Sequence, residues 1–456
     1  MAVPIDESKL LAPEESKRTI KRIVEDITNP MYKHTGLKLW GLFLLLMLII
    51  SGYAYFIQFR DGLGVTGLHD YVSWGAYISN FVFFVATSLV GMLISAVLGL
   101  TGIKWITPIA RIGEIVAVAF AMWAGLVIVI DMGRPDRLLN VFIHGRIQSP
   151  IVWDITVVST YVVISLLLLV LPLIPDMAIM KRYLPNAPTW QKKLFNILSF
   201  GWVGNKEQHK ILFRAIRILL ITIVPVALAI HTVTSWLFAS TLRPGWDSTI
   251  FGPYFVSGAF VAGVAAVIIA MYFFRTNFKL KQYLNEDIFN NIGKLLVLTA
   301  LVYLYFNLNE YLVPGYKMRK MEGHHLTEIF SGHYAPLFWS TQIFGLLLPI
   351  VLLLFKKMRK PKPLLIIAIF VLVGGWLKRY LIVVPTMLST YFPIQNVPDS
   401  MTTYSVTGLE VVLTIFPVIG AIIVMTIIAK LFPVIPIWET ATEQGVRVED
   451  MYGEEK

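Results

Sequence analysis

The chain has 456 residues, of which 56% are hydrophobic and only 15% are charged, and its formal net charge is +11. This composition is far from that of a soluble globular domain and indicates a protein embedded in a lipid bilayer. The sequence contains no cysteine, which excludes disulfides, thiolate metal sites, cysteine-ligated iron–sulfur clusters and covalently attached haem within this chain.

The first 38 residues are polar and lack the apolar core and cleavage site of a secretory signal. Ten apolar runs follow, each of roughly 20 residues or more, which is enough for a helix to cross a hydrocarbon core of about 30 Å. The sequence therefore predicts an all-α polytopic membrane protein. The predicted spans are 39–59, 73–99, 109–131, 152–175, 212–239, 251–273, 293–313, 336–355, 363–384 and 406–432.

Basic residues gather in every second break between these runs. Lys and Arg are concentrated in residues 1–38, 176–211 and 356–362, with two more lysines at 279 and 281. By the positive-inside rule this pattern places both termini in the cytoplasm. We interpret the net charge as a topology signal, so it does not indicate a nucleic-acid partner.

Short motifs recur at matching places and suggest a unit of four helices that is used twice. The pairs are WGAY at 74–77 with FGPY at 251–254, IGE at 112–114 with IGK at 292–294, and Pro150 to Trp153 with Pro336 to Trp339. Since four is even, the two units run in the same direction, which weakens an inverted-repeat transporter interpretation. The predicted organisation is a cytoplasmic segment (1–38), a flanking span with an outer loop (39–72), a first bundle (73–239), a second bundle (240–384), an outer loop with the last span (385–432) and a cytoplasmic tail (433–456).

Several breaks are long enough for structure of their own. Residues 176–211 and 15–28 mix apolar and basic residues and predict interfacial amphipathic helices. The outer breaks 314–335 and 385–405 offer docking surfaces for a partner subunit. The first of them contains His324, His325, Glu328 and His333. We interpret these side chains as solvated and predict no metal site.

Polar and ionisable side chains within spans are costly, so each is a functional candidate. They are Asn80, Glu114, Asp131, Asp154, His231, Glu310, Lys378, Arg379 and Glu410. The structural alternative is a packed histidine bonded to a neighbouring helix for His231, and an isolated protonated acid for Glu114. The other histidines lie in breaks or tails, so a haem held by two histidines is not expected.

A pocket near the outer face of the first bundle is the predicted binding site. The predicted lining residues are His69, Asp70, Asn80, Asp154 and His231. Such a pocket between the spans would be apolar enough for a quinone ring and polar enough to exchange its protons. Residues that only anchor the spans would look similar. The aromatic residues Trp74, Tyr77, Trp153 and Trp236 are interpreted first as an interfacial belt and second as ring-stacking groups.

The outer end of the third span carries the densest charged cluster, DMGRPDR at 131–137. A helix cap with snorkelling arginines explains it, and so does an arginine that pairs with a carboxylate or with an acidic partner.

Several stretches together resemble one family over nearly the whole chain. They are DMGRPDR, SPIVWD, HTVTSW, GPYFVSGA, YFNLNEYL, HYAPLFW, GGWLKRYLIVVP and FPVIPIWE. The chain resembles the NrfD, or PsrC-like polysulfide-reductase membrane-subunit, family. Its ten-span layout is similar to the branch with DsrP-type subunits, menaquinone-reductase subunits and the quinol subunits of alternative complex III.

The resemblance implies an anchor in the prokaryotic inner membrane that holds no haem or iron–sulfur cluster of its own. It would bind an exchangeable menaquinone or ubiquinone near the outer face and exchange electrons with an extracytoplasmic iron–sulfur subunit. Further membrane and cytochrome subunits are the other expected partners. Proton translocation is a further expectation.

Family positions carry over to individual residues of this sequence. His231 and Asp131 are expected to bind or deprotonate the quinol oxygen, and Arg134 to hold a carboxylate or stabilise negative charge. Trp74 and Trp236 are expected beside the ring, and Glu114 and Glu310 on a proton path. Leu89 and Leu237 stand where relatives in alternative complex III tend to have a histidine and an acid, which argues against a direct equivalent.

Two other functions fit the same sequence. A stand-alone secondary transporter or proton channel would need broken helices around a midplane site, and few such interruptions are present. A structural anchor whose quinone site has decayed is the third possibility, and the two leucines are compatible with it.

Overall fold

The computed structural model describes residues 10–32, 36–184, 187–391, 396, 398 and 401–452, and within them the protein is helical, without strands. Ten helices are long and apolar enough to span a membrane. The predicted all-α, multi-pass fold is therefore confirmed. The ten are α2 (Leu37–Asp61), α3 with a π-helical end (Ala76–Leu93, Ile94–Leu98), α5 (Thr107–Asp131), α7 continued by α8 (Pro150–Val170, Leu173–Tyr183), α10 (Lys206–Ala239), α11 (Phe251–Asn277), α12 (Glu286–Lys317), α14 continued by a π-helical segment and α15 (Ala335–Gln342, Ile343–Leu347, Leu348–Leu354), α16 (Pro361–Leu388) and α17 (Gly408–Leu431).

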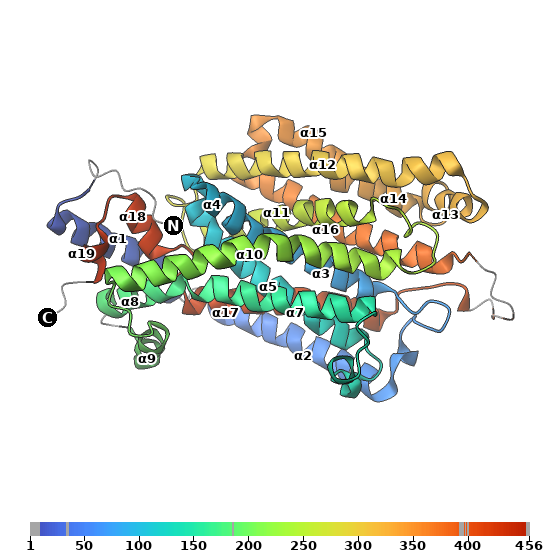
Figure 1. Cartoon of the computed structure of the whole chain (residues 1–456), viewed down its shortest axis with the longest axis horizontal. Coiled ribbons are helices and arrows are strands. Elements are labelled where there is room, and N and C mark those ends of the chain that lie inside the picture. The colour runs from blue at the N-terminus through green and yellow to red at the C-terminus, as the bar shows by residue number, and fades with distance from the viewer. Residues whose placement is uncertain are drawn as a thin grey trace.

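Shorter helices lie at the two ends of the spans. They are α1 (Pro13–Tyr32), α4 (Gly99–Thr101), α6 (Asn140–Ile143), α9 (Thr189–Leu198), α13 (Lys320–Phe330), α18 (Ile437–Glu443), α19 (Val448–Tyr452) and the 3₁₀ turns Leu63–Val65, Lys104–Ile106, Pro135–Arg137 and Lys356–Arg359. In Figure 1 the spans run along the long axis, with α1, α18 and α19 together at one end and α13 at the other. Helix α1 packs against α18 and α19, so the first and last described helices lie on the same side.

Helices α3 and α11 form the centre of the protein. The apolar window of α3 is fully buried and that of α11 is 83% buried, whereas in α2 the buried share is 22%. Helix α3 packs against α5, α11 and α16, and α11 packs also against α10 and α12. A polar side chain on α3 or α11 is therefore mostly surrounded by protein and shielded from lipid.

Several spans are longer than hydropathy predicted, because polar turns at helix ends are helical although they lie outside the apolar run. Helix α10 begins at Lys206, not 212, where the Asn205 side chain accepts a hydrogen bond from Gln208 N at 2.8 Å. Asn285 caps α12 in the same way, at 3.0 Å from Ile288 N. The predicted amphipathic region 176–211 is divided between the extension α8, the short helix α9 and the first turn of α10.

A close crossing of α3 and α5 at Gly91 and Gly113 sets the central packing. A Cβ added to Gly113 would lie 2.9 Å from Gly91 O, and one added to Gly91 would meet the Gly113 carbonyl. Small residues allow such backbone approach in membranes. We expect Gly91→Val to cost more than the ~1–3 kcal/mol typical of overpacking, because backbone itself must move. The yield and thermal stability of detergent-extracted protein would measure this.

The matched control is Gly41→Val in α2, where an added Cβ has nothing within 4 Å. This variant should extract and melt like the unaltered protein. Equal yields and melting temperatures for the two variants would contradict the proposed importance of the crossing.

Candidate functional site

His231 of α10 is buried in the interior, with 2% of its surface exposed, and its Nε2 has no hydrogen-bond partner among the described residues. Three residues later, Thr234 Oγ1 donates to Asp154 Oδ1 of α7 at 2.5 Å. Residues three apart share one face of a helix, so His231 lies on the face of α10 that contacts Asp154 through Thr234. The charge of Arg379 of α16 also acts on His231. We call His231, Asp154 and Arg379 the central polar patch.

Asp131 lies in a different cluster, at the outer ends of α2, α3, α5 and α17. Its Oδ1 is buried and has no partner among the described residues, and its charge interacts with Glu410 and Tyr77. Tyr77 donates to Gln58 Oε1 at 2.6 Å. Asp131 thus shares the unpartnered character of His231, although the structure places the two in separate clusters.

Glu410 in that cluster is structural. It is fully buried and accepts hydrogen bonds from Tyr404 OH at 2.7 Å, Thr407 N at 2.9 Å and Gly67 N at 2.9 Å. Thr407 and Glu410 form a capping box at the start of α17. A carboxylate with this many donors ties an outer loop to a helix end.

Asn80 and Trp74 connect elements of the interior. Asn80 accepts from Trp376 Nε1 at 2.6 Å and donates to Thr414 Oγ1 at 3.1 Å, so it joins α3 to α16 and α17. The ring of Trp74 packs against Phe238 and Trp246, with centroids 5.5 and 5.8 Å apart. Asn80 is thereby tied to α16 and α17, and Trp74 to the last turn of α10 and to the loop after it.

The other predicted binding residues lie at the outer surface. His69 Nε2 is 3.1 Å from Thr403 O within the loops, and Asp70 is exposed. Arg134 forms a two-bond pair with Asp136 at 2.9 and 3.0 Å, and this guanidinium lowers the pKa of Asp136. Arg134 therefore pairs with a carboxylate of its own motif.

The predicted aromatic belt is correct only in part. Trp153 and Trp236 are 37% and 47% exposed and pack edge to face. Tyr77 is fully buried, because its hydroxyl finds a partner inside the protein, so its assignment to the belt was wrong.

Glu114 lies near the opposite end of α5 and is 6% exposed. Its Oε1 accepts from Ser95 Oγ at 3.0 Å, whereas Oε2 has no partner among the described residues. One turn earlier, Arg111 pairs with Asp176 of α8, and Asp176 Oδ1 also accepts from Ile437 N and Trp438 N at 3.1 and 2.9 Å. The C-terminal segment is thereby fixed over this end of the protein.

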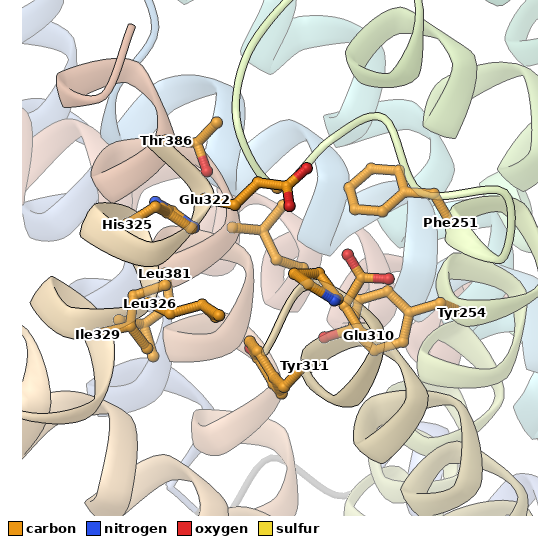
Figure 2. A pocket seen from close by; sticks show the side chains of 13 residues that line it. Phe251, Tyr254, Glu310, Tyr311, Glu322, His325, Leu326, Ile329, Leu381 and Thr386 are labelled. Carbon is orange, nitrogen blue, oxygen red and sulfur yellow. The ribbon is translucent and has the colours of Figure 1, made fainter. Parts of the chain in front are cut away.

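Two hollows lie among the later helices. The outer hollow is bordered by α11, α12, α13 and α16 and includes Glu310, Glu322 and His325 (Figure 2). The inner hollow lies deeper and is lined by Tyr303, Gln342, Lys378, Arg379 and small residues of α11, α14 and α16. Arg379 thus lines the inner hollow, and its charge also acts on His231.

Lys378 and Arg379 are the functional candidates to which the sequence gave no role. Each is 3% exposed, and neither forms an ion pair with a described acid. Lys378 Nζ donates to Tyr311 OH and lies 4.5 Å from the ring centroid of Tyr311, and Arg379 Cζ lies 5.3 Å from that of Phe255. The sequence feature that pointed to them is the presence of two adjacent cationic residues inside an apolar run.

The interpretation of the outer histidines as solvated loop residues was wrong for His325. Residues 320–330 form helix α13, and the spacing of Glu322, His325, Leu326 and Ile329 turns them to its buried face. Burial, with a smaller effect of His324, lowers the pKa of His325 to about 4, so its imidazole is neutral at pH 7. The described residues contain no group of three or more His, Cys, Asp or Glu placed to hold a metal.

The sequence model of one family, described as polysulphide reductase, NrfD, matches residues 64–390. The chain belongs to the NrfD family. Three curated relatives agree. The provisionally named membrane C-subunit of a dimethyl sulfoxide reductase of Halobacterium salinarum is 30% identical over 231 residues, or half of each chain. The C-subunit of a selenate reductase of Mesobacillus selenatarsenatis is 26% identical over 78% of this chain and 83% of its own length.

The third relative is the Hdr-like menaquinol oxidoreductase integral membrane subunit of Archaeoglobus fulgidus, 23% identical over 67% of this chain and 68% of its own. The alignment with the Halobacterium relative spans only half of that protein. The NrfD match begins in the loop before α3 and ends just after α16. It therefore contains the central polar patch and both hollows, whereas the C-terminal helices α17 to α19 lie outside it.

Proposed function

We propose that this NrfD-family chain is the quinone-interacting membrane subunit of a multisubunit respiratory oxidoreductase. Menaquinone or ubiquinone would supply reversible two-electron, two-proton chemistry, and an extracytoplasmic iron–sulfur subunit would exchange the electrons. The names of the three relatives support this proposal, since each is a subunit of a reductase or oxidoreductase and one belongs to a menaquinol oxidoreductase. Further membrane and cytochrome subunits would complete the complex.

The observation that carries the proposal is the unpartnered Nε2 of His231. A buried polar nitrogen without a partner is unusual, since most buried polar side chains are hydrogen-bonded. The residues present fit a quinone: an imidazole that can donate or accept a hydrogen bond, a carboxyl at Asp154 and a fixed cation at Arg379, all within an apolar interior.

In this proposal His231 binds an oxygen of the quinone and takes up or gives up a proton at Nε2. Thr234 of α10 donates a hydrogen bond to Asp154 of α7, and this bond holds the two helices together at the patch. Arg379 supplies a positive charge that stabilises negative charge near His231. Asp131, whose Oδ1 is likewise unpartnered among the described residues, is the second candidate for proton exchange, and Trp74, Asn80 and Trp236 are further candidates for contact with the quinone.

The outer end of the protein is the proposed docking side. Asp70 and the ion pair of Arg134 with Asp136 are exposed there. These charged side chains are accessible to an electron-transfer partner. The positive-inside pattern supports placing α1, α18 and α19 in the cytoplasm. Glu114 and Glu310, at opposite ends of the spans, are the proposed groups for proton passage.

Gentle purification of the native complex, followed by mass spectrometry and optical spectroscopy, tests this function. The proposal expects iron–sulfur subunits and a quinone to accompany the chain. A chain that purifies alone and without quinone would contradict it and would favour a stand-alone transporter or channel. Partners without quinone would favour a structural anchor.

A further inference from the structure

The outer hollow gathers three buried polar side chains, each with one polar atom that has no partner among the described residues. Glu310 Oε2, Glu322 Oε2 and His325 Nδ1 have no hydrogen bond among the described residues, and the three side chains are at most 7% exposed. They come from two elements, α12 and α13, and Figure 2 shows them around one hollow with Tyr254 and Tyr311 beside Glu310. Three such groups in one place indicate a built polar site.

Water is the ligand that this site fits best. A buried water needs two to four polar partners in a small polar space, and the hollow offers two carboxyl groups, an imidazole and two tyrosines. Glu322 also links the hollow to the protein surface, since its Oε1 lies 3.7 Å from Arg319 Nη1, whose side chain is 64% exposed.

A row of polar side chains leads inward from Glu310. The charge of Glu310 interacts with Lys378, and Lys378 Nζ donates to Tyr311 OH. Tyr254 interacts with Tyr311 and accepts at its hydroxyl from Tyr303 OH at 3.4 Å, with the two rings stacked 5.4 Å apart. The row is thus built from residues of α12, α16 and α11.

Arg379 closes the row at its inner end. It interacts with Tyr303, whose ring lies beside the Arg379 guanidinium at Gly258, and its charge also acts on His231. An arginine stays charged in proteins, so Arg379 does not pass a proton itself. The inner hollow, which both Arg379 and Tyr303 line, gives waters a place beside it.

We propose that these residues form a lateral relay that carries protons between His231 and the water of the outer hollow, through the second half of the protein. The inference rests on the proposed quinone function, because the quinone is the source or acceptor of these protons. For each quinol oxidised, two electrons pass to the acceptor centre of the complex and two protons leave by the relay. In quinone reduction the same two protons enter.

The test uses the native complex reconstituted in liposomes with a short-chain quinone analogue and an artificial electron donor or acceptor. Turnover, proton exchange reported by a pH-sensitive dye and binding of the analogue are measured in the same samples. The variants are Glu310→Gln, Glu322→Gln and His325→Gln. The matched control is His324→Gln, the exposed neighbour on the same helix.

We expect Glu310→Gln, Glu322→Gln and His325→Gln to slow turnover and proton exchange about tenfold or more while the analogue binds as before, and His324→Gln to behave normally. Should Glu310→Gln fail to assemble, the two α13 variants decide. Full turnover in every assembled hollow variant would overturn the relay and leave the quinone function standing. Loss of analogue binding in those variants would also overturn it, because the hollow would then belong to the quinone site. A wild-type complex with no quinone-linked turnover would contradict the proposed function and the relay together.

Discussion

Replacing Asp176 by Ala is expected to destabilise the protein by about 3–5 kcal/mol, the cost of breaking a buried ion pair from one side. The Arg111 and Asp176 side chains are 1% and 0% exposed. The change would leave the guanidinium without its counter-charge and would remove the acceptor of two backbone N–H groups, those of Ile437 and Trp438. We expect the C-terminal segment to detach and the yield of folded protein to fall sharply.

Thermal unfolding in detergent and protease sensitivity of the C-terminal segment measure this effect. The control is Asp136→Ala, whose exposed pair with Arg134 contributes little. A second check is a double replacement of Arg111 and Asp176 by leucine, which should recover part of the stability because no unpaired charge remains. If the Asp176→Ala protein were as stable as the Asp136→Ala protein, Asp176 would not hold the C-terminal segment in place as described.

Replacing His231 by Ala is expected to lower quinone-linked turnover by about 10²- to 10⁴-fold, the usual contribution of a positioned acid–base group. Assembly should be retained, since Nε2 makes no hydrogen bond to another described part of the protein. The measurement is steady-state turnover of the native complex with a quinone analogue, together with the set of proteins that purify with the chain.

His333→Ala is the matched control, because His333 lies at the outer surface, away from the central polar patch, and its replacement should leave turnover unchanged. Asp131→Ala tests the second cluster in the same assay. Normal activity in both the His231 and Asp131 variants would place the quinone site elsewhere in the chain.

Hydropathy was sufficient to predict the ten spans, because a bilayer demands long apolar helices with internally satisfied backbones. It did not predict where helices end. The first turns of α10 and α12 are polar and capped by Asn205 and Asn285, and an apolar window cannot detect them. The helix α13 was missed for a related reason, because only two of the four residues on its buried face, Leu326 and Ile329, are apolar.

For the candidate site, the cost of burying polar groups identified His231, Asp131, Asp154, Glu114 and Glu310 from the sequence alone. What the sequence could not supply was which of them meet. The electrostatic interactions of His231 with Arg379 and of Asp131 with Glu410 join helices that are far apart in the chain. Such contacts depend on tertiary packing and leave no local pattern.

Photolabelling of the native complex with an azido-quinone, followed by peptide mapping, tests the central claim most directly. The account predicts label on peptides of α10 and α16 around His231 and Arg379, and its loss when unlabelled quinone competes. Label that excess quinone does not displace, or that is confined to lipid-facing helices such as α2, would contradict a specific quinone site at the central polar patch.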